Sequence, residues 1–317
     1  MSDQPQRVAR QQDKPAIWHR ARLLSHGLVS GRLGLALIVL LNLCLGLAFS
    51  SLVPLGEAPD EPAHLSYARF IARTGRLPAS LNEREAAGYR STWPPLYHAL
   101  LAAPLAGVGD TPPTRLKSVG DTPRRLIPTN GQTIAAFIHT ADEVWPWRGL
   151  SLAWRLGRLI SVILTALAVI VTYLIAWRLT TRRSLALATA GLQATMPQVL
   201  FTGSVLNDDN LAILFSGLLF LTLVTYSQHI TPLTISKAFI PGALLGLATV
   251  TKYNTLPLWP LTLIWITWLT FRAPNYQLSI SNPKSPPFSP SLSALPSPPA
   301  GGSPSSGSTS IESKPWA

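Results

Sequence analysis

Two adjacent acidic residues, placed just after the first long apolar run, are the strongest candidates for chemistry. Segment 57–64 reads EAPDEPAH, so Asp60 and Glu61 lie between two prolines that stiffen the backbone. A carboxylate close to lipid is partly desolvated, which raises its pKa toward that of a general base. The alternative is that both acids only cap the helix that follows, because acidic residues favour a first helical turn.

A second acidic pair and a solitary lysine follow later in the chain. Asp208 and Asp209 lie in segment 207–210 (NDDN), whose alternative interpretation is a polar turn that caps the next helix. Lys252 is the one charge in the apolar stretch 238–271. Ionisable groups at membrane depth are costly and usually functional, whereas lysines near helix ends extend to the interface. An outward-facing Lys252 would suit a lipid phosphate.

Arg155 and Arg158 precede another apolar run and could either meet anions or anchor the chain at the interface. Segment 93–98 (WPPLYH) offers aromatic side chains, which are enriched at membrane interfaces. The six histidines and the single cysteine, Cys44, suggest no metal site and no disulfide framework.

The composition indicates what must position these residues. Of 317 residues, 47% are hydrophobic and 13% are charged, about half the charged fraction of a soluble domain. The net charge of +12 would suit nucleic acid, but the basic residues mostly flank apolar runs or lie in one loop. The sequence therefore predicts an all-α membrane protein that binds no nucleic acid.

Charge-free runs long enough to cross a bilayer, about 20 residues, predict the spans. They occupy 33–53, 159–177, 184–207 and 210–236. Stretch 238–271 is too long for one crossing, so we expect two short helices that turn near Lys252, Asn254 and Pro257. The prediction is a multi-pass protein of about six spans.

Basic residues flank the first, second and last spans at one end, which predicts that both termini are cytoplasmic. The loop 54–157, the 207–210 turn and Lys252 then share the outer face. In the loop, 63–74 has a helical period that Gly75 and Pro78 end, and 95–108 suits a helix on the membrane surface. Segment 109–131, rich in Pro, Thr and Gly, reads as a loop.

Three regions are expected from these shifts in composition. Residues 1–32 form a basic cytoplasmic segment, 33–272 form the membrane domain, and 273–317 form a Ser/Pro-rich tail whose composition is typical of disorder. The first apolar run is too long for the apolar core of a signal peptide, so an uncleaved span is expected. The location expected is the cell membrane.

Several motifs, taken in order, resemble a known family. They are APDEPAH (58–64) with Tyr67, GRLP (75–78), WPPLY (93–97), RLIS (158–161), the Asn207-Asp208 turn, and GLATVTKY (246–253). In this order they resemble the multi-pass GT-C glycosyltransferases, which include protein O-mannosyltransferases and lipid A aminoarabinose transferases. The resemblance covers about residues 33–271. Relative to that family, whose members have more spans, the chain looks truncated at its C-terminus.

The resemblance implies transfer of a sugar, with inversion, from a polyprenyl-phosphate carrier to a lipid, glycan or protein acceptor outside the membrane. It implies that Asp60 is the base, that Glu61 supports or orients it, and that Lys252 binds the departing phosphate. Asp208 would help to shape the site, and the remaining expected substrate contacts are His64, Arg158, Asp209 and Tyr253. Some relatives use a divalent metal, for which this sequence offers no clear ligand set.

A secondary transporter or a non-catalytic membrane protein is the alternative. Transporters place polar groups near the bilayer midplane and often contain two related halves. In this sequence the charges lie toward the outer edge and no repeat is visible. A cavity that joins Asp60 and Lys252 would favour the transferase, whereas a polar path through the midplane would favour transport.

Overall fold

The computed structural model describes residues 14–109, 116–119, 136–228 and 235–272, with side chains over 31–109, 116–119, 136–228 and 237–270. The predicted tail (273–317) and most of the predicted loop at 109–131 lie outside the described residues. The described residues are helical apart from short connections and one β-ribbon, whose two strands have two residues each. This confirms the all-α prediction.

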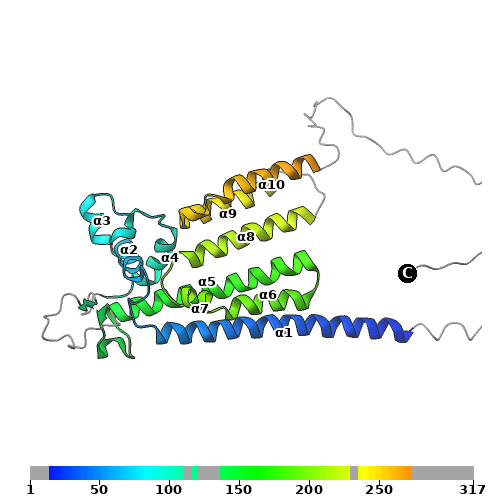
Figure 1. The fold of residues 1–317 in the computed structure, drawn as a ribbon, viewed down its shortest axis with the longest axis horizontal. Coiled ribbons are helices and arrows are strands. Elements are labelled where there is room, and N and C mark those ends of the chain that lie inside the picture. Colours follow the sequence, from blue (N-terminus) through cyan, green and yellow to red (C-terminus); the bar gives the residue numbers. More distant parts are fainter. Residues whose placement is uncertain (1–13, 110–115, 120–135, 229–234, 273–317) are drawn as a thin grey trace, which may run out of the picture. The chain divides into compact units, whose positions relative to one another are not determined.

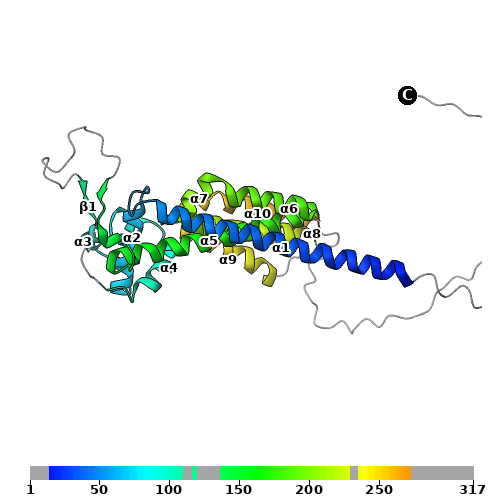
Figure 2. The same cartoon turned by 90° about the horizontal axis from the view of Figure 1, so that it is seen from below.

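Among the described residues, three helices are long and apolar enough to cross a membrane. These spans are Gly31–Leu52 of α1 (Lys14–Leu52), α5 (Gly149–Thr180) and α8 (Asp209–Gln228). Helix α5 packs against both α1 and α8, and Figures 1 and 2 show α1 running along it. The chain is therefore an integral membrane protein; the predicted total of about six spans stays a prediction.

The predicted span at 184–207 is two helices, α6 (Arg183–Thr195) and α7 (Pro197–Ser204). The break falls at Met196, which is extended because the following proline disfavours helical backbone in the residue before it. The Asn42 side chain donates to the carbonyl of Ala194, 3.1 Å away, and so satisfies one of the carbonyls at this helix end. Helix α5 also begins earlier than predicted, and it includes Arg155 and Arg158.

The remaining apolar stretch folds as a helical pair. Helix α9 (Ile235–Thr251) is followed by the 3-10 turn η5 (Tyr253–Thr255) and then by α10 (Leu258–Arg272). This confirms the predicted turn near Lys252. The predicted span at 210–236 is too long, since α8 ends at Gln228 and the chain has already entered α9 by Ile235.

Four short helices of the loop 54–157 gather at one end of the bundle (Figure 1). They are α2 (Glu61–Thr74), α3 (Leu81–Ala87), η1 (Tyr89–Thr92) and α4 (Leu96–Leu105). Gly75 ends α2 in a left-handed cap with φ 68°, as its position in the sequence predicted. The ribbon β1 (Lys117–Ser118) pairs antiparallel with β2 (Phe137–Ile138) and precedes the 3-10 turn η4 (Ala141–Glu143).

Helix α4 corresponds to the predicted surface helix, but much of it is covered by protein. Tyr97, His98 and Leu101 are buried, and the helix packs against α2 and α5. Tyr97 and Leu101 belong to one core with Leu65 of α2 and Trp154 of α5. This shared core fixes α2 and α4 against the N-terminal end of α5, where the candidate site lies.

Candidate functional site

Glu61 and Arg158 form a buried ion pair that joins the loop 54–157 to α5. Arg158 Nε and Nη2 each donate to one oxygen of the Glu61 carboxylate at 2.7 Å, and neither side chain is exposed. The same carboxylate accepts the backbone N–H groups of Gly56 and Leu206, both at 3.1 Å. Glu61 therefore holds together three segments that are distant in sequence.

The rest of the Arg158 guanidinium binds the end of α1 and the residues that follow it. Nη1 donates to the carbonyls of Ser50 and Val53, and Nη2 donates to that of Pro54, at 2.6–2.9 Å. With the two bonds to Glu61, all five guanidinium N–H groups are used within the protein. Arg158 was expected to contact substrate or to anchor at the interface; its contacts instead make it a structural residue.

Asp60 occupies the N-cap position of α2 but does not cap that helix. Its backbone is left-handed, with φ 63°, and its side chain makes no cap hydrogen bond. The carboxylate instead accepts the Tyr89 hydroxyl and the Arg90 guanidinium, both from η1. The side chain is 43% exposed, so it faces open space beside the loop. The capping interpretation therefore does not account for the Asp60 side chain.

The electrostatic surroundings of Asp60 correct the predicted pKa. The Tyr89 hydroxyl, followed by the Arg90 guanidinium, lowers the pKa of Asp60 below its ordinary value, and partial burial opposes this only in part. Proximity to lipid, taken alone, predicts a raised pKa for Asp60. In this structure Asp60 is a stable carboxylate, ready to accept hydrogen bonds but a weaker base than predicted.

Arg90 is a site residue that the sequence argument missed. Its guanidinium stacks on the Trp93 ring with 3.8 Å between the carbon Cζ and the ring centroid, and the residue is only 7% exposed. Nη2 binds Asp60, whereas Nε and Nη1 are buried without a hydrogen-bond partner among the described residues. Arginine just before the aromatic segment 93–98 was the available signal in the sequence.

Two buried histidines lie behind Asp60. His64 Nδ1 is 2.9 Å from Nε2 of His98, and the two rings stack. Burial, together with the positive charge of Arg90, lowers the pKa of each to about 3. His64 and His98 are therefore a neutral, hydrogen-bonded pair. His64 was an expected substrate contact, and its partner from α4 was not anticipated.

Lys252 lies between two aspartates. Its ammonium is 2.9 Å from Asp208 Oδ1 and 2.8 Å from Asp209 Oδ1. Asp208 is buried, and its Oδ2 has no hydrogen-bond partner among the described residues, whereas the side chain of Asp209 is 43% exposed. The Asn207 side chain accepts the Asp209 N–H at 2.9 Å, so the capping interpretation of this turn applies to Asn207.

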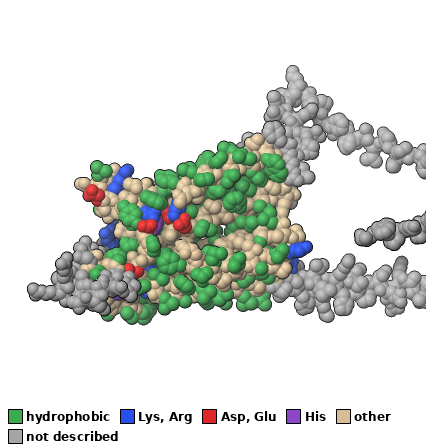
Figure 3. All heavy atoms as spheres, viewed as in Figure 1, with side chains coloured by type: hydrophobic (Ala, Val, Ile, Leu, Met, Phe, Trp, Pro, Cys, Tyr) green, Lys and Arg blue, Asp and Glu red, His purple; other side chains and the backbone are tan. Residues whose placement is uncertain are grey.

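These groups converge although they come from separate segments. His64 is influenced electrostatically by Asp60, Arg90 and Lys252, and His98 by Asp208. Figure 3 shows acidic and basic side chains gathered between the helices of the loop 54–157 and the bundle, whose visible face is mainly hydrophobic. Tyr253 lies next to Lys252 in η5 and is 56% exposed. Of the expected site residues, Asp60, His64, Asp208, Asp209 and Lys252 thus gather at one end of the bundle.

Within the described part of the chain, no three His, Cys, Asp or Glu side chains cluster as metal ligands. The carboxylates nearest the site are already engaged, since Glu61 binds Arg158 and both aspartates of the 207–210 turn bind Lys252. Because these carboxylates are held in ion pairs, the oxygen ligands present do not fit a resident metal.

Comparison with curated proteins and with solved structures gave no match. A family model does match part of the chain, from the first turns of α5 to just beyond α10. This range contains Arg158, Asp208 and Lys252, while Asp60 and Arg90 lie before it. Residues 153–281 match the family of dolichyl-phosphate-mannose-protein mannosyltransferases, which are membrane glycosyltransferases that use polyprenyl-phosphate sugar donors.

Proposed function

We propose that this chain transfers a sugar from a polyprenyl-phosphate carrier to an acceptor hydroxyl at the outer face of the cell membrane, with Asp60 as the general base. The acceptor oxygen attacks the anomeric carbon as Asp60 takes its proton. The bond between that carbon and the phosphate oxygen breaks, and the phosphate leaves on its lipid. Attack opposite the leaving group inverts the configuration at the anomeric carbon.

The observation that carries this proposal is the difference in availability among the carboxylates of the site. Glu61 is enclosed and Asp208 is buried against Lys252, whereas Asp60 and Asp209 have exposed side chains. Of these two, Asp209 is paired with Lys252, and Asp60 is the one that follows the first span. A general base must reach a substrate proton at hydrogen-bond distance, which requires such exposure. Because Asp60 follows a membrane span directly, it would meet a lipid-borne donor at the membrane surface.

Lys252 and Asp208 have the supporting roles in this proposal. A positive group near the leaving phosphate stabilises the charge that develops there. Lys252 supplies such a group, and the two aspartates hold its ammonium in place. Their charges also oppose an approaching phosphate, so Lys252 would serve better when the phosphate lies on the side away from Asp209. Tyr253, exposed beside it, could contact the donor.

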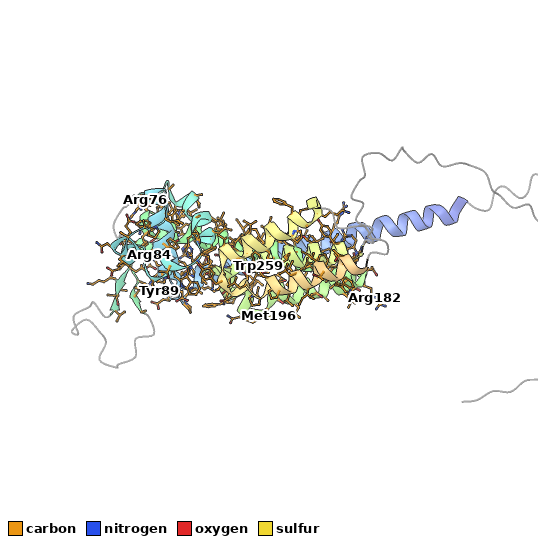
Figure 4. The ribbon with its side chains drawn as sticks, turned by 90° about the horizontal axis from the view of Figure 1, so that it is seen from above. Arg76, Arg84, Tyr89, Arg182, Met196 and Trp259 are labelled. Atoms are coloured by element: carbon orange, nitrogen blue, oxygen red, sulfur yellow. The ribbon has the colours of Figure 1, made fainter. Side chains whose placement is uncertain are left out.

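The partial family match favours mannose as the sugar and a protein or glycan as the acceptor. The sequence resemblance also admits aminoarabinose and a lipid acceptor. We expect the membrane domain to comprise residues 33–272, with the loop 54–157 facing outward. Tyr89 and Arg182 lie toward opposite ends of the bundle in Figure 4, as this topology requires.

The direct test incubates membranes containing the full chain with radiolabelled polyprenyl-phosphate mannose and, separately, with the aminoarabinose donor. Label should pass into a protein, glycan or lipid fraction, and it should do so less with Asp60→Asn. Absence of transfer from either donor in membranes where the chain is folded would overturn the proposal. Cysteines at Asn82 and Arg182, in a Cys44→Ser background, test the orientation, since an impermeant maleimide should label only Asn82→Cys in intact cells.

A further inference from the structure

The Arg90 guanidinium has two edges in different situations. One edge donates to Asp60 through Nη2, and the other carries Nε and Nη1, which are buried and unpartnered among the described residues. Buried N–H groups of a charged side chain are costly when unpaired, more so than those of a neutral group. Stacking on Trp93 fixes the plane of the Arg90 guanidinium but supplies no hydrogen-bond acceptor. The second edge therefore suits a ligand with acceptor atoms.

An anion is the ligand that this edge recognises best. The planar fork of arginine matches the oxygens of a phosphate or carboxylate, and paired charged hydrogen bonds are the strongest kind in proteins. Among the neighbours of Arg90, His64 and His98 carry no charge at neutral pH, because burial lowers their pKa values to about 3. Lys252 is already placed between two carboxylates, so Arg90 is the better candidate for the first contact with an incoming anion.

We propose that Arg90 is shared between Asp60 and the phosphate of the lipid donor, so that donor binding weakens the Arg90–Asp60 pair and makes Asp60 a stronger base. This inference rests on the proposed function. Without donor, Asp60 remains tied to Tyr89 and Arg90. With donor, part of the guanidinium charge is directed to the phosphate, and Asp60 gains basicity when a transferable sugar is present.

Competition between the phosphate and Asp60 for Arg90 acts in both directions, and it can be measured without catalysis. If the phosphate and Asp60 compete for one cation, each must weaken the hold of the other by the same factor. Removing the Asp60 charge should then strengthen phosphate binding, which is the reverse of what losing a ligand contact would do.

The test measures binding of geranylgeranyl phosphate to the detergent-solubilised full chain, with inorganic phosphate and geranylgeraniol as comparison probes. Arg90→Gln should weaken geranylgeranyl phosphate binding about tenfold or more, which corresponds to at least about 1.4 kcal/mol. Asp60→Asn should tighten it several-fold. Inorganic phosphate should show the same order of variants at lower affinity, and geranylgeraniol, which lacks the phosphate, should show no dependence on Arg90.

The matched control is Arg76→Gln, since Arg76 lies in the same loop but is exposed and paired with Glu83. It should bind like the unaltered chain. If thermal unfolding shows that Arg90→Gln is unstable, Arg90→Lys takes its place in the test. It keeps the charge and should bind more weakly than the unaltered chain but retain part of the affinity. Equal affinity in Arg90→Gln and the unaltered chain would overturn the inference, as would an Asp60→Asn variant that binds no more tightly.

The two proposals fail in different experiments. Loss of the Arg90 and Asp60 effects on binding, with sugar transfer intact, would remove the coupling and leave the glycosyltransferase assignment. Absence of transfer, with the binding order retained, would leave a phosphate-lipid site and remove the enzymatic assignment.

Discussion

Asp60 and Glu61 are neighbours in sequence, yet their surroundings in the fold are opposite. The Glu61 carboxylate is fully enclosed and receives four hydrogen bonds, two of them from an arginine that has no N–H left to use. Asp60 is exposed and pairs with Arg90, whose buried Nε and Nη1 have no hydrogen-bond partner among the described residues. In the first pair every N–H of the arginine has a partner, and we call such a pair saturated. In the second pair the arginine retains unpartnered nitrogens among the described residues, and we call that pair available.

The difference shows how one acidic motif can serve two purposes. A satisfied buried pair specifies geometry, because breaking either side leaves a charge without a partner. An incompletely satisfied pair at the surface is available to change partners. The left-handed backbone at Asp60 separates the two side chains, directing one toward η1 and leaving the other beneath α2. The saturated pair can thus position the available one.

The largest effect should come from Asp60→Asn. Asparagine preserves size and can still accept a hydrogen bond, but it cannot take a proton, so turnover should fall about 10²–10⁴-fold. Thermal stability should change little, because the side chain is exposed. Sugar transfer and unfolding are measured on the same preparation. Near-normal turnover would remove the distinction between the two carboxylates.

Glu61→Gln should mainly affect folding. It leaves Arg158 buried without a charged partner, and breaking a buried pair typically costs about 3–5 kcal/mol. Thermal unfolding in detergent should show this loss, and Glu85→Gln, at an exposed glutamate of the same loop, serves as the control. A Glu61→Gln protein that is as stable as the unaltered chain but inactive would instead make Glu61 part of the chemistry.

Lys252→Met tests whether the second cluster resembles the saturated pair or the available one. It should destabilise the chain by about 3 kcal/mol, since Asp208 stays buried and charged. The double variant Lys252→Met with Asp208→Asn should recover much of that stability. Donor affinity that stays low in the double variant supports a phosphate contact for Lys252, whereas recovery of affinity would make Lys252 structural only.

The smallest effect should come from Tyr89→Phe. The Tyr89 hydroxyl is the largest cause that lowers the pKa of Asp60, so its removal should raise that pKa toward the ordinary value. Asp60 would then protonate at higher pH, so the acid limb of the pH profile of transfer should shift to higher pH. The contribution of this hydrogen bond to stability is present above the unfolded pKa of Asp60 and is lost as pH falls. A pH profile identical to that of the unaltered chain would contradict the assignment.

The sequence predicted those parts of the fold that depend on neighbours along the chain. The apolar runs identified the long helices, Gly75 ended α2, and the polar residues around Lys252 marked the turn between α9 and α10. The break at Met196 was missed because apolar residues continue through it, although Pro197 was a usable signal. The β-ribbon was missed because two-residue strands have no detectable period.

By itself, the sequence determined that this is a helical membrane protein and which acidic and basic residues could act at one of its faces, because composition and helical period are local properties. Only the tertiary structure decided what each charged group does. Glu61 and Arg158 are 97 positions apart, Asp208 and Lys252 are 44 apart, and Arg90 meets Asp60 across 30 positions. Whether a charge is saturated or available depends on such distant partners, and no local pattern encodes them.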